Sequence, residues 1–126
     1  MERFALRPEW DGMKTIRVAE HARSPGGRFK SDGPFSGEWF REEILSPALG
    51  RAIEAGEPLA VELGGTSGYG SSFLEEAFGG LIRKRRFTPD QVGQWLRITS
   101  ESPIYSPYRA LAERYVQAAK PESEAA

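Results

Sequence analysis

The chain has 126 residues, no cysteine, one histidine and a formal net charge of −1, from 17 basic and 18 acidic residues. This length is typical of one domain and suffices to bury a core without disulfides or metal. The absence of cysteine excludes disulfides, zinc fingers, iron–sulfur clusters and thiol nucleophiles. The near-zero charge argues against nucleic-acid binding as the main role. One histidine cannot build a multi-histidine metal site, and we expect neither a metal nor a cofactor.

The sequence also lacks the apolar segments that membrane insertion or export requires. No apolar run approaches the roughly 18 residues of a membrane-spanning helix. The first twelve residues contain no signal-peptide core. We therefore expect a cytoplasmic protein without a membrane segment.

Alternation of apolar and polar residues predicts three strands, over Lys14–Glu20, Leu59–Leu63 and Trp95–Thr99. Phe4 and Leu6 alternate in the same way. They predict an earlier strand, joined to the first through a turn region at residues 8–12.

Helices are predicted between and after these strands. Ser36 is a suitable N-cap for a helix over residues 37–45. Pro47 lacks a backbone donor and predicts a break or kink there, with Ser46 as the cap of a second helix. Gly56 is expected to end that second helix.

Two capping-box patterns mark later helices, because a hydroxyl residue is followed three positions on by Glu or Gln. Ser72 with Glu75 begins one helix, and Thr88 with Gln91 begins a short one. The last helix is expected to begin at Ser106, where apolar residues follow at i, i+3, i+4 and i+7 spacing.

Strands separated by helices favour a parallel or mixed sheet with right-handed crossovers. We predict an α/β fold, with a mixed sheet of about four strands and helices packed against it. Residues 1–120 are expected to form a single domain. Residues 121–126 are small or acidic after a proline, and predict a disordered tail.

The segment Gly64–Ser72 (GGTSGYGSS) joins a predicted strand to a predicted helix. Glycines let a backbone approach a ligand, and a helix N-terminus offers unpaired N–H groups to an anion. Neither a Walker pattern nor a complete GxGxxG is present. The segment is therefore either a phosphate-compatible site or only a tight turn.

Two segments resemble a known family. SSFLEEAFGGLIR at residues 71–83, preceded by LAVELGGTSGYG, resembles the hallmark of the STAS-like domain family of uncharacterised function. GRFKSDGPFSGEWFREEILSPAL at residues 27–49 resembles the family's first-helix region. The resemblance spans most of the chain, and such domains are similar to the STAS domains of anti-sigma factor antagonists. It implies a small α/β fold and a partner of the histidine-kinase-like ATPase class.

In antagonist STAS domains an Asp-Ser-Ser-Gly motif lies at the corresponding turn, and its second serine is phosphorylated by the partner. The matching positions here are Gly70, Ser71, Ser72 and Phe73. Both serines match, whereas Gly70 replaces the aspartate and Phe73 replaces the final glycine. The resemblance therefore implies Ser72 as the first candidate for phosphorylation and Ser71 as the second.

These observations together predict a non-catalytic regulatory module that binds a partner protein through the turn. The alternative is a domain that senses a nucleotide or another anion at Gly64–Ser72. An enzyme is not expected, because acids, bases and nucleophiles are scattered and no G-x-S-x-G elbow is present. The predicted contact residues are Gly68, Tyr69, Gly70, Ser71, Ser72, Phe73 and Arg28.

Three further features have a structural and a functional interpretation. The basic run at residues 83–86 is either a charged helix end or a contact for an anion. The helix face with Arg41 and its neighbouring glutamates is interpreted as solvated. Phe35, Trp39 and Tyr69 form a partner-binding patch if they are exposed together.

Overall fold

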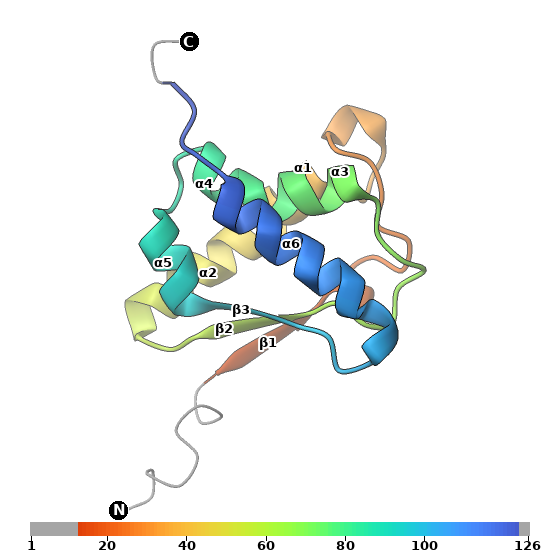
Figure 1. The fold of residues 1–126 in the computed structure, drawn as a ribbon, viewed down its shortest axis with the longest axis horizontal. Helices are drawn as coiled ribbons and strands as arrows, with labels where there is room; N and C mark the ends of the chain where they lie inside the picture. Colours follow the sequence, from red (N-terminus) through yellow and green to blue (C-terminus); the bar gives the residue numbers. More distant parts are fainter. Residues whose placement is uncertain (1–12, 124–126) are drawn as a thin grey trace, which may run out of the picture.

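A computed structural model describes residues 13–123, and within them three strands form the sheet. The strands are β1 (Lys14–Arg17), β2 (Leu59–Glu62) and β3 (Leu96–Thr99), paired in parallel in the order β1-β2-β3. The α/β class is confirmed, but the described sheet is wholly parallel and has three strands, not a mixed sheet of about four. The predicted strand at Phe4 and Leu6 lies outside the described residues. A helical connection precedes β2 and β3, which lets neighbouring strands run in the same direction (Figure 1).

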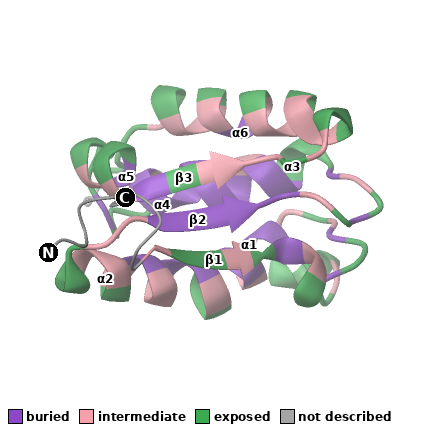
Figure 2. Cartoon of the chain, turned by 90° about the horizontal axis from the view of Figure 1, so that it is seen from below, coloured by how far each residue is buried: buried purple, intermediate pink, exposed green. Residues whose placement is uncertain are grey.

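The strand register determines which side chains enter the core. Val61 pairs with Ile16 and with Ile98, while Leu59 pairs with Leu96. These apolar residues belong to one hydrophobic cluster with the helices, and β2 is buried along its whole length (Figure 2). The helices pack on one face of the sheet, and no helix of residues 13–123 covers the opposite face.

The first helical segment runs without a break through α1 (Gly37–Phe40), a π-helical turn (Arg41–Leu45) and α2 (Ser46–Ala55). Ser36 caps it as predicted, because its hydroxyl accepts the Trp39 N–H at 3.1 Å. Gly56 ends it in the left-handed conformation, at φ 72°.

The predicted break at Pro47 is wrong, because the dihedral angles on both sides of Ser46 remain helical. The Ser46 N–H donates to the carbonyl of Arg41, five residues back. The bonding pattern thus shifts by one residue immediately before Pro47, which has no N–H to donate. The π-turn therefore lets the helix continue through the proline at which the sequence pattern predicts a boundary.

The second helical segment comprises α3 (Ser71–Leu74), a π-turn (Glu75–Gly79) and α4 (Gly80–Arg83). Its N-cap is Gly70, so the predicted capping box of Ser72 with Glu75 does not form. Glu75 instead binds arginines from elsewhere in the fold, which removes it from capping.

The remaining predictions of secondary structure need smaller corrections. α5 (Pro89–Trp95) begins with the predicted capping box, and α6 (Ser106–Ala118) begins where expected. β1 is shorter than predicted, because residues 18–20 form a 3₁₀ turn; further 3₁₀ turns lie at Lys30–Asp32 and Pro103–Tyr105. None of the helices in residues 13–123 combines the length and apolar character needed to cross a membrane.

The start of the predicted tail contacts the domain. The Glu122 N–H donates to the carbonyl of Arg83 at 2.8 Å, and the Glu122 carboxylate lies 3.4 Å from Nζ of Lys84. Residues 121–123, the start of the predicted tail, thus lie beside the end of α4. The last three residues lie outside the described part of the chain.

The two π-turns meet where the two helical segments pack most closely. A Cβ on Gly37 would lie 2.5 Å from the Phe73 carbonyl oxygen, and one on Gly80 would lie 2.4 Å from a guanidinium nitrogen of Arg41. Arg41 and Glu76 are both buried. The Arg41 Nη1 donates to the Glu76 carboxylate at 2.7 Å and to its backbone carbonyl at 2.8 Å. Because glycine has no side chain, Gly37 and Gly80 leave room for this buried ion pair.

We expect Gly37→Ala to destabilise the fold by about 1–3 kcal/mol, because the added methyl group must push α1 away from α3. Gly50→Ala is the matched control: Gly50 lies in α2 and a Cβ there meets nothing within 4 Å. This control should stabilise the chain by up to about 1 kcal/mol through helix propensity. Urea denaturation of both variants measures the difference. Equal effects of the two substitutions would contradict the close packing at Gly37.

The Arg41–Glu76 pair also predicts acid sensitivity. Burial raises the pKa of the Glu76 carboxyl, but Arg41, through its hydrogen bond and charge, together with Arg83 and Arg28 lowers it by more, so it lies below the ordinary 4.5. The unfolded chain therefore takes up this proton first as the pH falls. The contribution to stability is complete above about pH 4.5 and is lost as the pH falls through the folded pKa.

Glu76→Gln tests this contribution through urea denaturation between pH 7 and pH 3. At neutral pH it should cost about 3–5 kcal/mol, because Arg41 stays buried without its partner. Below about pH 4.5, the slope of the free energy of unfolding against pH should also decrease by the equivalent of about one bound proton. The exposed Glu43→Gln is the control and should leave stability nearly unchanged. An unaltered acid slope in Glu76→Gln would refute the assignment.

Candidate functional site

The turn from Gly64 to Ser72 follows β2 and leads into α3, and tyrosine hydroxyls fix its backbone. Tyr105 donates to the carbonyl of Thr66 at 2.5 Å, and Tyr69 donates to that of Leu63 at 2.6 Å. Burial raises the pKa of the Tyr69 hydroxyl, so it stays protonated and remains a donor. Gly68 has a φ of 120°, and a Cβ there would lie 2.8 Å from the Tyr108 hydroxyl oxygen. The glycine is therefore required by backbone conformation and by the neighbouring tyrosine.

Glu62, the last residue of β2, anchors the start of this turn. Its carboxylate accepts hydrogen bonds from the Thr99 hydroxyl at 2.7 Å and from the N–H groups of Gly64 and Glu101, both at 3.0 Å. Burial raises the pKa of Glu62, but these hydrogen bonds lower it by more, and the carboxylate stays ionised. The ends of β2 and β3 are thereby tied to one another.

The structure separates the predicted contact residues into an exposed and a buried group. Gly70, Ser71 and Ser72 are exposed, and neither serine hydroxyl forms a hydrogen bond within residues 13–123. Tyr69 is 9% exposed and Phe73 is fully buried. These two aromatic residues therefore support the turn from within the core and offer little surface to a partner, whereas the serines project from it.

A second loop, residues 24–35, lies beside the turn. The Ser67 N–H donates to the carbonyl of Arg23 at 2.8 Å, and the Ser67 and Ser24 hydroxyls lie 3.2 Å apart. The loop is closed on itself, because Gly26 donates to Phe35 and Glu38 donates to Arg28 through backbone groups. Both loops consequently belong to one fixed surface at this end of the molecule.

This second loop carries two exposed aromatic side chains. Phe29 is 47% exposed and Phe35 is 40% exposed. The patch predicted from Phe35, Trp39 and Tyr69 does not form, because Tyr69 is buried and Trp39 is half-buried beneath Phe35, their rings 5.4 Å apart. Phe29 instead supplies the second exposed ring, which the sequence pattern gave no reason to choose over the other aromatic residues.

Three arginines from different elements surround the adjacent carboxylates of Glu75 and Glu76. Arg28, from the second loop, donates to Glu75 at 2.5 Å and to Glu76 at 3.3 Å. Arg83, at the end of α4, binds both carboxylates, and Arg41 binds Glu76. We call these five residues the arginine–glutamate cluster. It connects the second loop to the helix that begins at the serines.

The cluster corrects the interpretation of Arg41. Its helix face is predicted to be solvated, but the Arg41 side chain is only 4% exposed. Charged residues on a helix are usually exposed, and the partner on another helix is invisible in a single sequence. The one available signal is the pair of glycines after Glu75-Glu76, of which the second, Gly80, leaves the space that the guanidinium fills.

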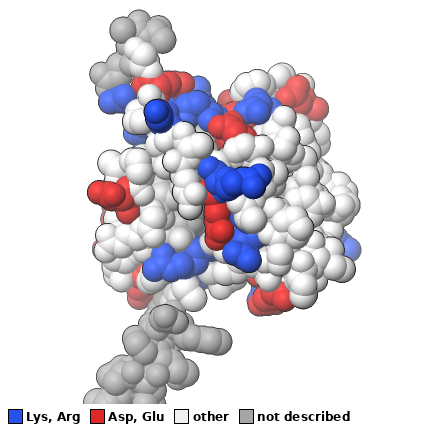
Figure 3. Space-filling view, in the orientation of Figure 1, with Lys and Arg blue, Asp and Glu red and all other residues white. Residues whose placement is uncertain are grey.

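The basic run at residues 83–86 is largely engaged by neighbouring groups. Arg83 belongs to the cluster, Lys84 and Arg85 contact Glu122, and the Arg86 guanidinium carbon lies 5.6 Å from the Phe87 ring centroid. On the face seen in Figure 3, blue and red side chains lie next to one another. This arrangement supports the interpretation of the run as a charged helix end.

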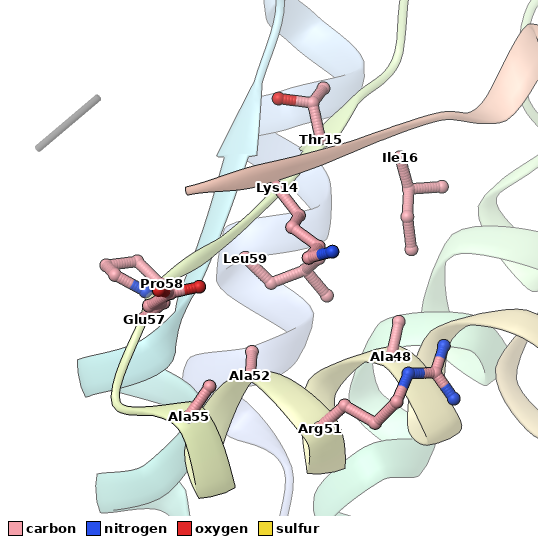
Figure 4. Close-up of a pocket in the computed structure, with 10 residues that line it drawn as sticks. All are labelled: Lys14, Thr15, Ile16, Ala48, Arg51, Ala52, Ala55, Glu57, Pro58 and Leu59. Atoms are coloured by element: carbon pink, nitrogen blue, oxygen red, sulfur yellow. The ribbon is translucent and has the colours of Figure 1, made fainter. Parts of the chain in front are cut away.

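The cavities lie away from the two serines. A groove of about 320 Å³ lies between β1 and α2, and Figure 4 shows the small side chains of Ala48, Ala52 and Ala55 along its wall. It lies at the amino ends of β1 and β2, opposite the turn. Within residues 13–123, no three His, Asp or Glu side chains are grouped to hold a metal ion.

Comparison with protein families matches residues 36–104 to a family described as a STAS-like domain of unknown function. No curated protein and no solved structure matches the chain. The matched region contains the turn, the exposed serines and four members of the arginine–glutamate cluster. It covers more than half of the chain, and the resemblance of the serine-containing segment is confirmed: the chain belongs to this STAS-like domain family.

Proposed function

We propose that this chain is a non-catalytic regulatory module that binds a partner protein through the turn, with Ser72 as a phosphorylation switch. One observation carries the proposal. Two serine hydroxyls are exposed and unengaged within residues 13–123, on a backbone that tyrosines and Glu62 hold in place. A hydroxyl that caps a helix is occupied by its own chain, whereas these two are available to another protein.

The family resemblance supplies the partner class, a histidine-kinase-like ATPase. In the proposed step, Oγ of Ser72 attacks the γ-phosphorus of ATP held by that partner. An O–P bond forms, the bond between the β–γ bridging oxygen and the γ-phosphorus breaks, and ADP leaves. The hydroxyl proton passes to a base of the partner or to water. The product carries about −1.5 to −2 charges on a side chain that was neutral.

The arginine–glutamate cluster removes the main electrostatic objection to this step. Glu75 and Glu76 lie one helical turn after Ser72, where free carboxylates would repel a phosphate. Each carboxylate is bound by at least two arginines. The new charge therefore meets a group of three cations and two anions.

The partner surface in this proposal extends from the serines to the second loop. Phe29 and Phe35 are exposed on a backbone closed by its own hydrogen bonds. Exposed aromatic side chains on a rigid support are the type of residue that dominates protein–protein interfaces, because little order is lost on binding. Arg28 lies between the two surfaces and belongs to both.

Nucleotide or anion sensing at the turn has less support. The N–H groups of Ser67 and Gly68 already donate within the protein, at 2.8 Å and 3.2 Å. The cavity of about 360 Å³ beside Gly64 and Gly65 is lined by three carboxylates, those of Glu20, Glu62 and Glu101, against one guanidinium, that of Arg17. Negative charge at this place opposes an anionic ligand. Partner binding remains the function that we propose.

Ser72→Ala should abolish phosphorylation by the partner ATPase while leaving the fold intact. Since the hydroxyl supports no described contact, the free energy of unfolding should change by less than about 0.5 kcal/mol. Ser36→Ala is the matched structural control, because Ser36 caps α1, and it should cost about 1 kcal/mol. Intact-mass measurement after incubation with ATP and the ATPase, with urea denaturation beside it, separates the two effects. Unchanged incorporation in the Ser71→Ala, Ser72→Ala double variant would rule out the switch.

Phe29→Ala should weaken binding of the partner ATPase by about tenfold or more, as expected for an aromatic residue at the centre of an interface. Gln94→Ala, at an exposed position in α5 before β3, is the control and should leave the dissociation constant unchanged. Isothermal titration calorimetry with the unphosphorylated chain measures both. Equal affinities of the two variants would place the partner elsewhere.

A further inference from the structure

The three arginines of the cluster differ in how firmly they are held. Arg41 is buried and donates to both the carboxylate and the backbone carbonyl of Glu76. Arg83 uses two guanidinium nitrogens, one for each carboxylate. Arg28 is the most exposed, at 33% of its side chain, and reaches both carboxylates through a single nitrogen. Arg28 is therefore the least firmly held of the three: it makes two bonds, as Arg83 does, but through one nitrogen of the most exposed side chain.

Removing Arg28 would leave neither carboxylate without a partner. Glu75 would keep Arg83, and Glu76 would keep both Arg41 and Arg83. Removing Arg41 would instead strip a nearly fully buried carboxylate of its buried partner. The movement of Arg28 thus avoids the cost of an uncompensated buried charge, which is the large term in breaking buried ion pairs.

Arg28 binds the two carboxylates that follow Ser72 by one helical turn. Glu75 and Glu76 are the i+3 and i+4 neighbours of Ser72, and such neighbours have Cβ atoms about 5–6 Å apart. The Glu75 N–H donates to the carbonyls of Ser71 and Ser72, so the first turn here is regular. The i+3 neighbour of Ser71 is the fully buried Leu74, and its i+4 neighbour is Glu75, so Ser71 has one of the two carboxylates beside it. Of the two serines, Ser72 has both arginine-bound carboxylates as its neighbours.

We infer that Arg28 is the receptor for a phosphoryl group on Ser72, and that its guanidinium passes from Glu75 to the phosphate. This inference rests on the proposed phosphorylation of Ser72. A phosphate offers three acceptor oxygens and more charge than a carboxylate, and it accepts the paired N–H groups of a guanidinium. Arg28 gives up its single-nitrogen contacts with the two carboxylates and gains a stronger contact with the phosphate, while Glu75 keeps Arg83.

The exchange would change the partner surface and leave the fold in place. Backbone bonds fix the loop at this point: Glu38 donates to Arg28 at 2.9 Å, and Gly37 donates to Gly27 at 3.0 Å. Only the side chain of Arg28 needs to move. Its guanidinium carbon lies 6.0 Å from the ring centroid of the exposed Phe29, so its departure alters the charge beside that ring. Phosphorylation at the start of α3 thereby changes the surface of the second loop.

The test uses the full chain with phosphoserine incorporated at position 72, with and without Arg28→Gln. Phosphorus NMR follows the second ionisation of the phosphate, which has an unperturbed pKa of about 6. A bound guanidinium favours the dianion, so this titration should occur at higher pH in the Arg28→Gln chain, by roughly one pH unit. Phosphoserine at position 71, which neighbours one of the two carboxylates, is the matched control and should differ clearly less between the two backgrounds.

Three outcomes would overturn the inference. The first is that the phosphate at position 72 titrates at the same pH with and without Arg28→Gln. The second is that Arg28→Gln changes the titration equally for phosphoserine at positions 71 and 72. The third is that the Arg28→Lys chain titrates at the same pH as the chain with Arg28. The last two would indicate a general effect of positive charge. Amide spectra of each variant verify that it is folded, and the retained charge of Arg28→Lys provides a milder substitution than Arg28→Gln. No partner is present in the experiment, so its failure is distinguishable from failure of partner binding or of phosphate transfer.

Discussion

The close packing of two helical segments around the Arg41–Glu76 pair is the constraint on which the rest of the structure depends. Two ions are buried there, and such a pair is costly unless its geometry is good and its remaining hydrogen bonds are made. Gly37 and Gly80 supply the space, and Arg41 also bonds to the backbone of the opposite helix. Both helices contain a π-turn at this place, beginning at Arg41 and at Glu75. In the segment SSFLEEAFGGLIR, the acidic pair and the double glycine therefore have a packing explanation.

This packing leaves the segment's two serines with a different role. The same helix that holds Glu76 in the core exposes Ser71 and Ser72 at its start, where Gly70 takes the capping position. Buried polar groups must be satisfied by the protein itself, whereas an exposed hydroxyl costs nothing when left to water. The turn before the serines is fixed by Tyr69, Tyr105 and Glu62, so their position is defined even though their hydroxyls are unengaged. A defined position with a free hydroxyl is the property that the proposed switch requires.

Local signals in the sequence predicted most elements correctly, and contacts between distant residues account for the failures. Ser36, Gly56 and the pair Thr88–Gln91 act within one helical turn, and their predicted roles are confirmed. The pattern of Ser72 with Glu75 failed because Glu75 binds Arg28, 47 residues away, in place of the local backbone. The sequence pattern places Arg41 on a solvated face, because its partner Glu76 is on another helix. The exposed serines could be predicted as candidates from the family motif. The exposure of Phe29 could not, since burial distinguishes it from the other aromatic residues only in the folded chain.

The near-zero net charge takes on a different meaning once these contacts are known. Much of the charge around the candidate site is paired internally: three arginines bind Glu75 and Glu76, and Lys30 lies 2.8 Å from Glu42. What the turn itself exposes is small and neutral, and the adjoining loop adds two phenylalanines. On a surface whose charges are already matched, a single phosphate is a large relative change. Under the proposed function, Arg28 binds the new phosphate, because it is the most exposed arginine of the cluster and its departure leaves Arg83 on Glu75 and both Arg41 and Arg83 on Glu76.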